Sequence, residues 1–122
     1  MDNLPVIANL WVLAEDGRTP IQAPDVLAWG DCMEDYRKRQ VGYDVNPETG
    51  MGASTVFYGM ARFGGDVSKP MFFETMVFDR NSPTFIRLSQ TWEEAEQTHM
   101  ALCAVYGIPT GVTEHIQGVP NV

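Results

Sequence analysis

Long apolar runs and basic side chains are scarce in this sequence of 122 residues. No stretch approaches 18 consecutive apolar residues, so we expect no membrane-spanning helix. The first residues, Met1–Pro5, lack the basic region and apolar core of a secretory signal, so we expect no leader. Lys and Arg number 8 against 16 Asp and Glu, which gives a formal net charge of −8. Because nucleic-acid affinity depends on cations that neutralise phosphates, we expect no nucleic-acid partner.

Cysteines and the motifs of common enzymes are also rare or missing. Cys32 and Cys103 are the two cysteines of the chain, and we expect them to be free thiols in a reducing cytoplasm rather than a disulfide. The sequence contains no Walker loop, no dinucleotide-binding glycine fingerprint and no nucleophile elbow. We therefore expect no cofactor, and we favour a protein without enzymatic activity.

The residues that are present indicate one α+β domain. Hydrophobic residues make up 44% and charged residues 20% of the chain, as in an ordinary globular protein. We predict a three- to four-stranded antiparallel meander packed with two helices. The predicted strands cover 54–63, 71–79 and 84–89, the predicted helices cover 24–40 and 92–106, and a strand over 6–13 is a candidate for the sheet edge. We interpret 42–53 as a loop, 1–106 as the domain and 107–122 as a tail rich in glycine and proline.

The two helices have different local signals. In the second helix Thr91 and Glu94 have the spacing of a capping box, and Gly107 is typical of a residue that ends a helix. The first helix has apolar residues three and four positions apart, from which we predict a buried stripe. The members of that stripe are Val26, Trp29, Met33 and Tyr36.

The segment Met71–Asp79 is the strongest strand of the sequence. Both of its faces are mostly apolar, so we expect it to be central and covered on both sides, or on one side by a partner subunit. Glu74 lies in the middle of this strand, where a buried carboxylate needs a partner, and we expect Arg62 or Arg87 to supply it. A Glu74 side chain close to His99 would instead be a candidate acid/base pair, and these two residues are the weak catalytic candidates.

A metal site has little support in the sequence. His99 and Cys103 are four positions apart on one helix, which is the spacing of two ligands to one ion. A structural zinc site needs four ligands, and Cys32 and His115 are the other good donors of the chain. His115 lies in the predicted tail, so we expect no metal.

The candidate binding residues come from the methionines of the predicted sheet. Met60, Met71 and Met76 could form an adaptable contact surface, because methionine side chains are flexible and polarisable. Phe72 and Arg62 lie beside them in sequence and complete the candidate binding set.

Several of these segments together resemble a known group of proteins. The segments are the strand Ser54–Met60, the glycine pair Gly64–Gly65, the run Pro70–Phe78, and Thr91–Ala95 with His99. Their order resembles small uncharacterised proteins encoded by tailed bacteriophages and prophages, over about residues 10–105. The Phe-Glu-Thr-Met-Val-Phe run and the strand before it are the specific parts.

The resemblance implies a phage origin and this topology, and it implies no reaction. The sequence also departs from the pattern of the group at two places. The group has Asp-His after the first strand where this chain has Ala61–Arg62, and Gly-Gly after the second strand where this chain has Arg80–Asn81.

Three functions follow as expectations. The first is a phage-encoded, non-enzymatic accessory protein that binds a host or phage protein in the host cytoplasm, for instance to inhibit a defence factor. The second is a virion component, such as a head decoration or connector subunit, for which the tail 107–122 and the strand 71–79 would support homo-oligomer assembly. The third is a small acid/base enzyme that uses Glu74 and His99.

Overall fold

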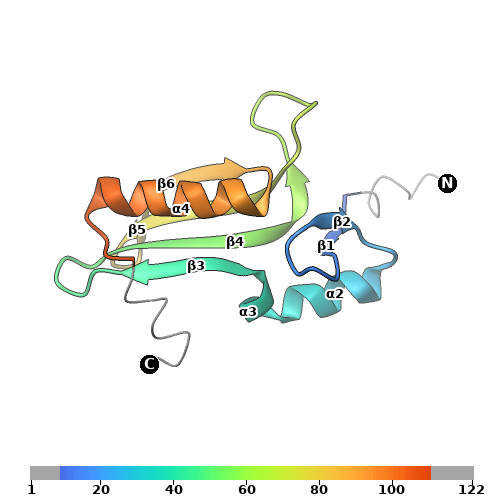
Figure 1. Cartoon of the computed structure of the whole chain (residues 1–122), viewed down its shortest axis with the longest axis horizontal. Coiled ribbons are helices and arrows are strands. Elements are labelled where there is room, and N and C mark those ends of the chain that lie inside the picture. The colour runs from blue at the N-terminus through green and yellow to red at the C-terminus, as the bar shows by residue number, and fades with distance from the viewer. Residues whose placement is uncertain (1–8, 111–122) are drawn as a thin grey trace.

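The computed structural model describes residues 9–110 and confirms an α+β fold with an antiparallel sheet (Figure 1). In chain order the elements are β1 (Trp11–Leu13), β2 (Pro20–Gln22), α2 (Val26–Glu34), α3 (Tyr36–Arg39), β3 (Gln40–Val45), β4 (Met51–Arg62), β5 (Met71–Asp79), β6 (Ser82–Ser89) and α4 (Trp92–Tyr106).

The main sheet has four strands in the order β3-β4-β5-β6, and every neighbouring pair is antiparallel. β5 is therefore an inner strand, as its doubly apolar sequence predicted. Phe73, Thr75 and Val77 alternate along one face of β5 and are at most 1% exposed. On the other face Phe72 is buried against Trp11, but Met76 and Phe78 are only half-buried. The α4-facing side of β5 is thus fully covered, as predicted, whereas the other side is covered only in part.

Helix α4 covers the buried face of the sheet and is closed at both ends as its sequence predicted. The Thr91 side chain accepts from the Glu94 amide, while the Glu94 side chain accepts from the Thr91 amide. At the other end Gly107 takes the left-handed conformation with φ +69°, which ends the helix without strain. Ala95, His99 and Cys103 form its buried line and face the sheet.

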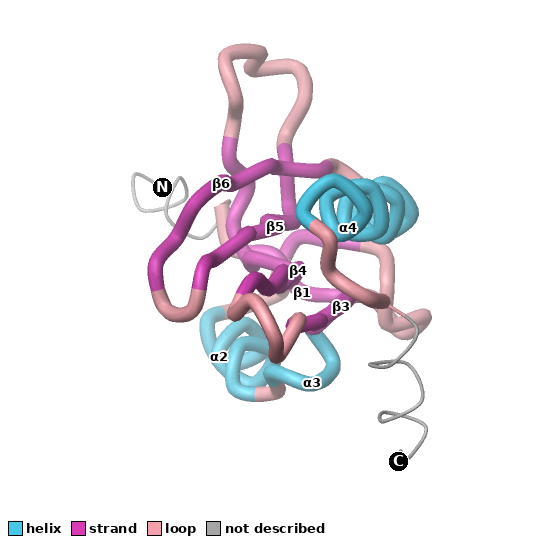
Figure 2. The backbone as a smooth tube through the Cα atoms, turned by 90° about the vertical axis from the view of Figure 1, so that its left-hand side faces the viewer, coloured by secondary structure: helices cyan, strands magenta, loops and turns pink. Residues whose placement is uncertain are grey.

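The N-terminal elements lie on the opposite side of the sheet from α4, as Figure 2 shows. β1 and β2 form a separate two-stranded sheet, and α2 packs beside them. The Trp29 ring N–H donates to the Gly59 carbonyl over 2.9 Å. Gly59 has φ +85° and lies within the register shift of β4 between Phe57 and Arg62, so the strand bulges at this glycine.

The predicted helix 24–40 is wrong in its middle. The helix breaks at Asp35, whose non-helical backbone (φ −93°, ψ 78°) ends α2 and whose side chain accepts from the Lys38 amide to begin α3. Of the predicted buried stripe, Val26 is 53% and Tyr36 46% exposed. Because the non-helical Asp35 interrupts the helical repeat, one periodic stripe cannot run through both helices.

The predicted loop 42–53 is also wrong, because most of it is strand. β3 covers 40–45 and pairs with the first half of β4, which begins at Met51 and leaves a turn of five residues over 46–50. Gly42 and Asp44 are residues that strands disfavour, so no local signal in the sequence indicated this strand. Both positions face α4 and contact His99. A Cβ on Gly42 would lie 2.9 Å from the ring of His99, so only glycine leaves room for the ring.

The edges of the domain differ from the prediction as well. The strand predicted over 6–13 does not join the main sheet: β1 is limited to Trp11–Leu13 within the described residues and pairs with β2. Ile108, at the start of the predicted tail 107–122, is 5% exposed and belongs to the core beside Cys103. Residues 111–122 of that tail, and 6–8 of that strand, lie outside the described residues.

Each described helix is too short or too polar to cross a membrane. The predicted free thiols are confirmed, since Cys32 is half-buried and Cys103 buried without a disulfide.

Candidate functional site

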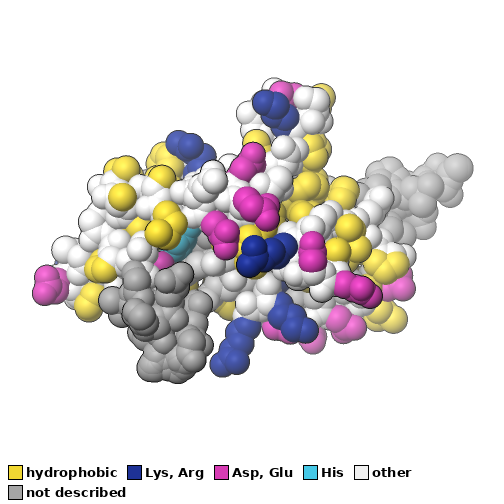
Figure 3. Space-filling model, in the orientation of Figure 1, with side chains coloured by type: hydrophobic (Ala, Val, Ile, Leu, Met, Phe, Trp, Pro, Cys, Tyr) yellow, Lys and Arg dark blue, Asp and Glu magenta, His cyan; other side chains and the backbone are white. Residues whose placement is uncertain are grey.

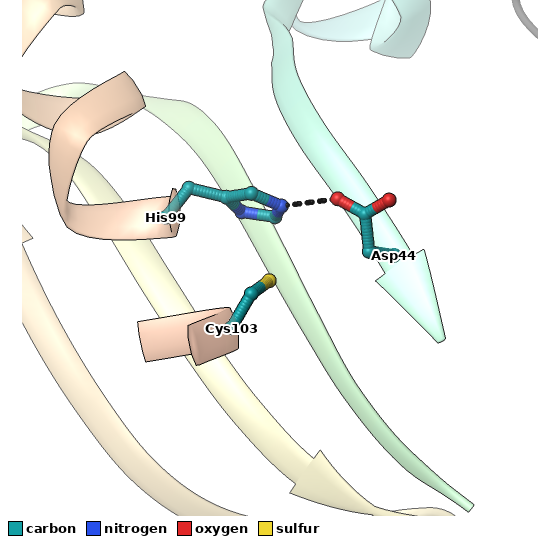
Figure 4. Close-up of side chains that lie close together, drawn as sticks. All are labelled: Asp44, His99 and Cys103. Carbon is teal, nitrogen blue, oxygen red and sulfur yellow. Dashed lines mark hydrogen bonds and ion pairs between the residues drawn. The ribbon is translucent and has the colours of Figure 1, made fainter. Parts of the chain in front are cut away.

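A cluster of polar side chains lies buried between α4 and the sheet. His99 and Cys103 come from one face of α4 because they are one helical turn apart. Asp44 comes from the edge strand β3 and Thr55 from β4, and both point toward α4 because they occupy positions of the same face. None of the four side chains belongs to a residue more than 4% exposed. Figure 4 shows His99 pointing from the helix to Asp44, with Cys103 beneath them.

Three short hydrogen bonds join Asp44, His99 and Thr55, together with Thr75 of β5, into one chain. His99 Nε2 lies 2.7 Å from Asp44 Oδ2, and His99 Nδ1 lies 2.7 Å from Thr55 Oγ1. Thr55 in turn donates its hydroxyl proton to Thr75 Oγ1 over 2.8 Å. Asp44 Oδ1 has no hydrogen-bond partner among the described residues, although it is buried. The chain therefore leaves one oxygen of a buried carboxylate unsatisfied, which is an uncommon and costly arrangement.

Cys103 lies beside the carboxylate. Burial, and to a lesser degree the charge of Asp44, raise the pKa of the Cys103 thiol to about 12. A thiol with so high a pKa is protonated at neutral pH and is a weak nucleophile. Cys103 therefore does not have the character of a catalytic cysteine.

Hydroxyl, imidazole and carboxylate follow one another here in the order found in hydrolase triads. Thr55 is fully buried, however, and a second threonine accepts its proton. No substrate can approach a hydroxyl in that position, so the geometry does not support nucleophilic catalysis. What the cluster does offer is one donor atom each from Asp44, His99 and Cys103, and these three atoms lie within 4.8 Å of one another.

Glu74 is paired as expected, and its partner is Arg62. The Arg62 guanidinium donates to Glu74 Oε2 over 2.7 Å and lies over the Tyr58 ring, 4.6 Å from its centroid. Arg87 stands opposite Thr75 in the register, so it points to the other face of the sheet.

The same alternation separates Glu74 from His99. Glu74 precedes Thr75, which faces α4 with His99, so its side chain leaves the sheet on the opposite side. The predicted acid/base pair is therefore wrong, because the sheet lies between the two groups.

The structure brings only some of the predicted binding residues together: Arg62 stands opposite Met71 in the pairing of β4 with β5. Met76 stands opposite Ser54 and Ile86 on the outer face of the sheet, whereas Met71 lines a groove on the α4 side. Met60 packs against the small core beneath β1 and β2. Phe72 is 7% exposed, and Arg62 is engaged with Glu74. These five residues do not form one surface.

An open groove runs between α4 and β6 instead. Its volume is about 540 Å³. The apolar part of its lining is Met71, Leu88, Ala101, Leu102 and Val105, and Arg87 and Glu94 add charge. β6 is the last strand of the sheet, and within residues 9–110 it pairs with β5 alone. Figure 3 shows hydrophobic side chains over the α4 region, with acidic and basic side chains interspersed across the rest of this face.

Sequence reasoning missed Asp44, Thr55 and the groove. An aspartate and a threonine at alternate, α4-facing positions of paired strands were the available signal, but it was visible only once 40–45 was known to be a strand. Comparison with known proteins adds no relative: no family model, curated protein or solved structure matches this chain. The resemblance to phage proteins stays a prediction.

Proposed function

We propose that this protein is a protein-binding module that takes an extended segment of its partner as a fifth strand beside β6. The observation that carries the proposal is the open edge of β6 next to the groove that α4 and β6 enclose. Domains that recognise extended peptides use this combination, because the strand edge supplies main-chain hydrogen bonds and the groove selects side chains.

β6 is suited to strand addition by its length and its sequence. It has eight residues, and its outer edge presents amide and carbonyl groups that no described strand satisfies. Proteins that avoid such pairing place prolines, charges or bulges along the edge. Here Pro83 and a register shift at Thr84 interrupt the start of the strand, and Arg87 is its single charge, so the regular part of the edge is Phe85–Ser89. Ile86 is 46% exposed in the middle.

The groove determines what kind of segment fits. Alternate side chains of an added strand point to the α4 side, where Met71, Leu102 and Val105 offer apolar contact. The net charge of −8 attracts a basic partner and repels an acidic one. The expected ligand is therefore an extended segment with alternate apolar side chains and at least one lysine or arginine.

A binding role agrees with the absence of an accessible catalytic group in the polar cluster. The resemblance to phage proteins supports a non-enzymatic accessory protein in the host cytoplasm, with a host or phage protein as the partner. The same open edge favours one alternative, in which the segment added to β6 belongs to a second copy and the protein is a virion component.

The proposal can be tested with peptides selected from a random display library against the full chain. Their affinities are then measured by fluorescence anisotropy for wild type, Val105→Arg and Leu27→Arg. Val105 is 74% and Leu27 81% exposed, so neither change disturbs the core, but only Val105 lines the groove. We expect at least a tenfold loss for Val105→Arg and no loss for Leu27→Arg.

Two further results would distinguish the alternatives. Peptides that bind wild type and Val105→Arg equally, or a library that yields no binder, would refute the proposal that the groove binds an extended segment. Light scattering that shows a dimer broken by Val105→Arg would favour the second copy as the occupant and the virion component as the function.

A further inference from the structure

The hydrogen-bond chain around His99 determines where its ring protons lie. Thr55 donates to Thr75, so the Thr55 oxygen acts as acceptor toward His99 Nδ1 at 2.7 Å. That bond places a proton on Nδ1. In a neutral imidazole Nε2 then carries a lone pair, because only one of the two nitrogens is protonated.

This lone pair faces an acceptor. Nε2 lies 2.7 Å from Asp44 Oδ2, and an ionised carboxylate oxygen has only lone pairs to offer. Two acceptors cannot stay at this distance unless a cation lies between them. The cation is either a proton or a metal ion.

Two further groups at the same point have no use in a purely proton-linked pair. Asp44 is 4% exposed, has no lysine or arginine partner among the described residues, and leaves Oδ1 unpartnered. The Cys103 thiol is fully buried and makes no side-chain hydrogen bond within residues 9–110, yet its sulfur is within 4.8 Å of the nitrogen and oxygen donors. A metal ion would use all of these donors at once.

We propose that Asp44, His99 and Cys103 form a zinc site that ties helix α4 to the edge strand β3. Imidazole nitrogen, thiolate sulfur and carboxylate oxygen are the donors that zinc takes in proteins, whereas a thiolate disfavours magnesium and calcium. The second oxygen of Asp44 or a water fills the fourth position. Thr55 Oγ1 accepts a hydrogen bond from Nδ1–H and so orients the ring.

Binding requires a small local change. Tetrahedral ligands about 2.0 Å from zinc are separated by about 3.3 Å, so the contact between Nε2 and Oδ2 must open by about 0.6 Å. β3 is an edge strand with no neighbour on its outer side among the described strands, which permits this movement. The thiol proton, and the proton otherwise shared by Nε2 and Oδ2, leave to solvent as the metal–ligand bonds form.

The test uses the full chain after treatment with a chelator and a reductant. Co²⁺ replaces Zn²⁺ as the probe, because a cobalt–thiolate bond gives charge-transfer absorption in the near ultraviolet. We expect this absorption to saturate at one equivalent and to disappear when Zn²⁺ is added. Zn²⁺ is also expected to raise the Tm of the wild-type protein, because a ligand that binds the folded state stabilises it.

Variants identify the ligands. Cys103→Ser should abolish the absorption with an unchanged circular dichroism spectrum. Should that variant fail to fold, Asp44→Asn keeps the thiolate and should weaken Co²⁺ binding at least tenfold. The matched control is Cys32→Ser combined with His115→Gln, which removes the other cysteine and the other histidine of the chain and should leave the absorption in place.

Two outcomes would overturn the proposal. One is wild-type protein that shows no charge-transfer absorption at one equivalent of Co²⁺ and no change of Tm with Zn²⁺, in which case the cation between Nε2 and Oδ2 is a proton. The other is absorption that survives Cys103→Ser or is lost in the control variant, which would place the metal elsewhere.

Discussion

The buried threonine at the centre of the polar chain offers a direct measure of what that chain contributes to stability. Thr55 is fully buried and makes two hydrogen bonds, at 2.7 Å to His99 Nδ1 and at 2.8 Å to Thr75. Thr55→Val replaces the hydroxyl with a methyl group of similar size. The backbone and the shape of the core are therefore retained, while both bonds are lost.

The magnitude follows from what the change leaves behind. A buried Nδ1–H without an acceptor costs about 1–3 kcal/mol, and loss of the donor to Thr75 costs about 1 kcal/mol more. The added methyl group returns about 0.8 kcal/mol through burial. We expect the free energy of unfolding to fall by about 2 kcal/mol, which lowers the Tm of a domain of this size by about 8 °C.

The assay is urea unfolding of the metal-free protein, followed by tryptophan fluorescence, with Thr55→Ser as the matched control. Serine keeps the hydroxyl and loses one buried methyl, for about 1 kcal/mol. The order of stability should be wild type, then Thr55→Ser, then Thr55→Val. A Thr55→Val protein more stable than Thr55→Ser would refute the reasoning, because packing rather than the hydrogen-bond chain would then dominate at this position.

Three other predictions concern separate features. A double-mutant cycle of Glu74→Gln and Arg62→Met should give a coupling of about 1 kcal/mol, because the pair is close but partly exposed; zero coupling would mean that the ion pair does not persist in solution. Gly59→Ala should lower the unfolding free energy by at least about 2 kcal/mol in urea melts, since φ is +85° and the new Cβ would lie 2.5 Å from Met33; unchanged stability would contradict the bulge. Metal-free protein should lose up to about 1.4 kcal/mol per pH unit from Cys103 between pH 9 and 12, because the unfolded thiol ionises first and the folded one keeps its proton. Cys103→Ala should remove that slope, and an identical slope in the variant would assign it to another group.

The elements that sequence analysis predicted well are those whose structural signals lie within the element itself. Helix α4 has its capping box and its terminal glycine within a few residues of its ends, and both signals act locally. β5 is apolar on both faces, and a strand with that pattern can only be satisfied inside a sheet. The break at Asp35 was missed because an aspartate four residues before Arg39 also suits a continuous helix. Its cap on the Lys38 amide exists only once the chain has turned.

Only the part of the polar cluster that lies within one helix could be predicted from the sequence. His99 and Cys103 are related by the helical repeat, so their common face follows from their spacing alone. Asp44 lies 55 positions before His99 and reaches it through the pairing of β3 with β4, which no local pattern encodes.

In β3, Gly42 and Asp44 contradict strand propensity, and each does so on account of His99, one by leaving space for its ring and the other by bonding its Nε2. A glycine and an acid at alternate positions of a strand are therefore informative when a histidine or cysteine elsewhere lacks a partner. Local sequence patterns failed to predict β3, whose Asp44 lies with His99 and Cys103 so that their donor atoms are within 4.8 Å of one another. The cobalt experiment tests whether these three donors bind a metal ion.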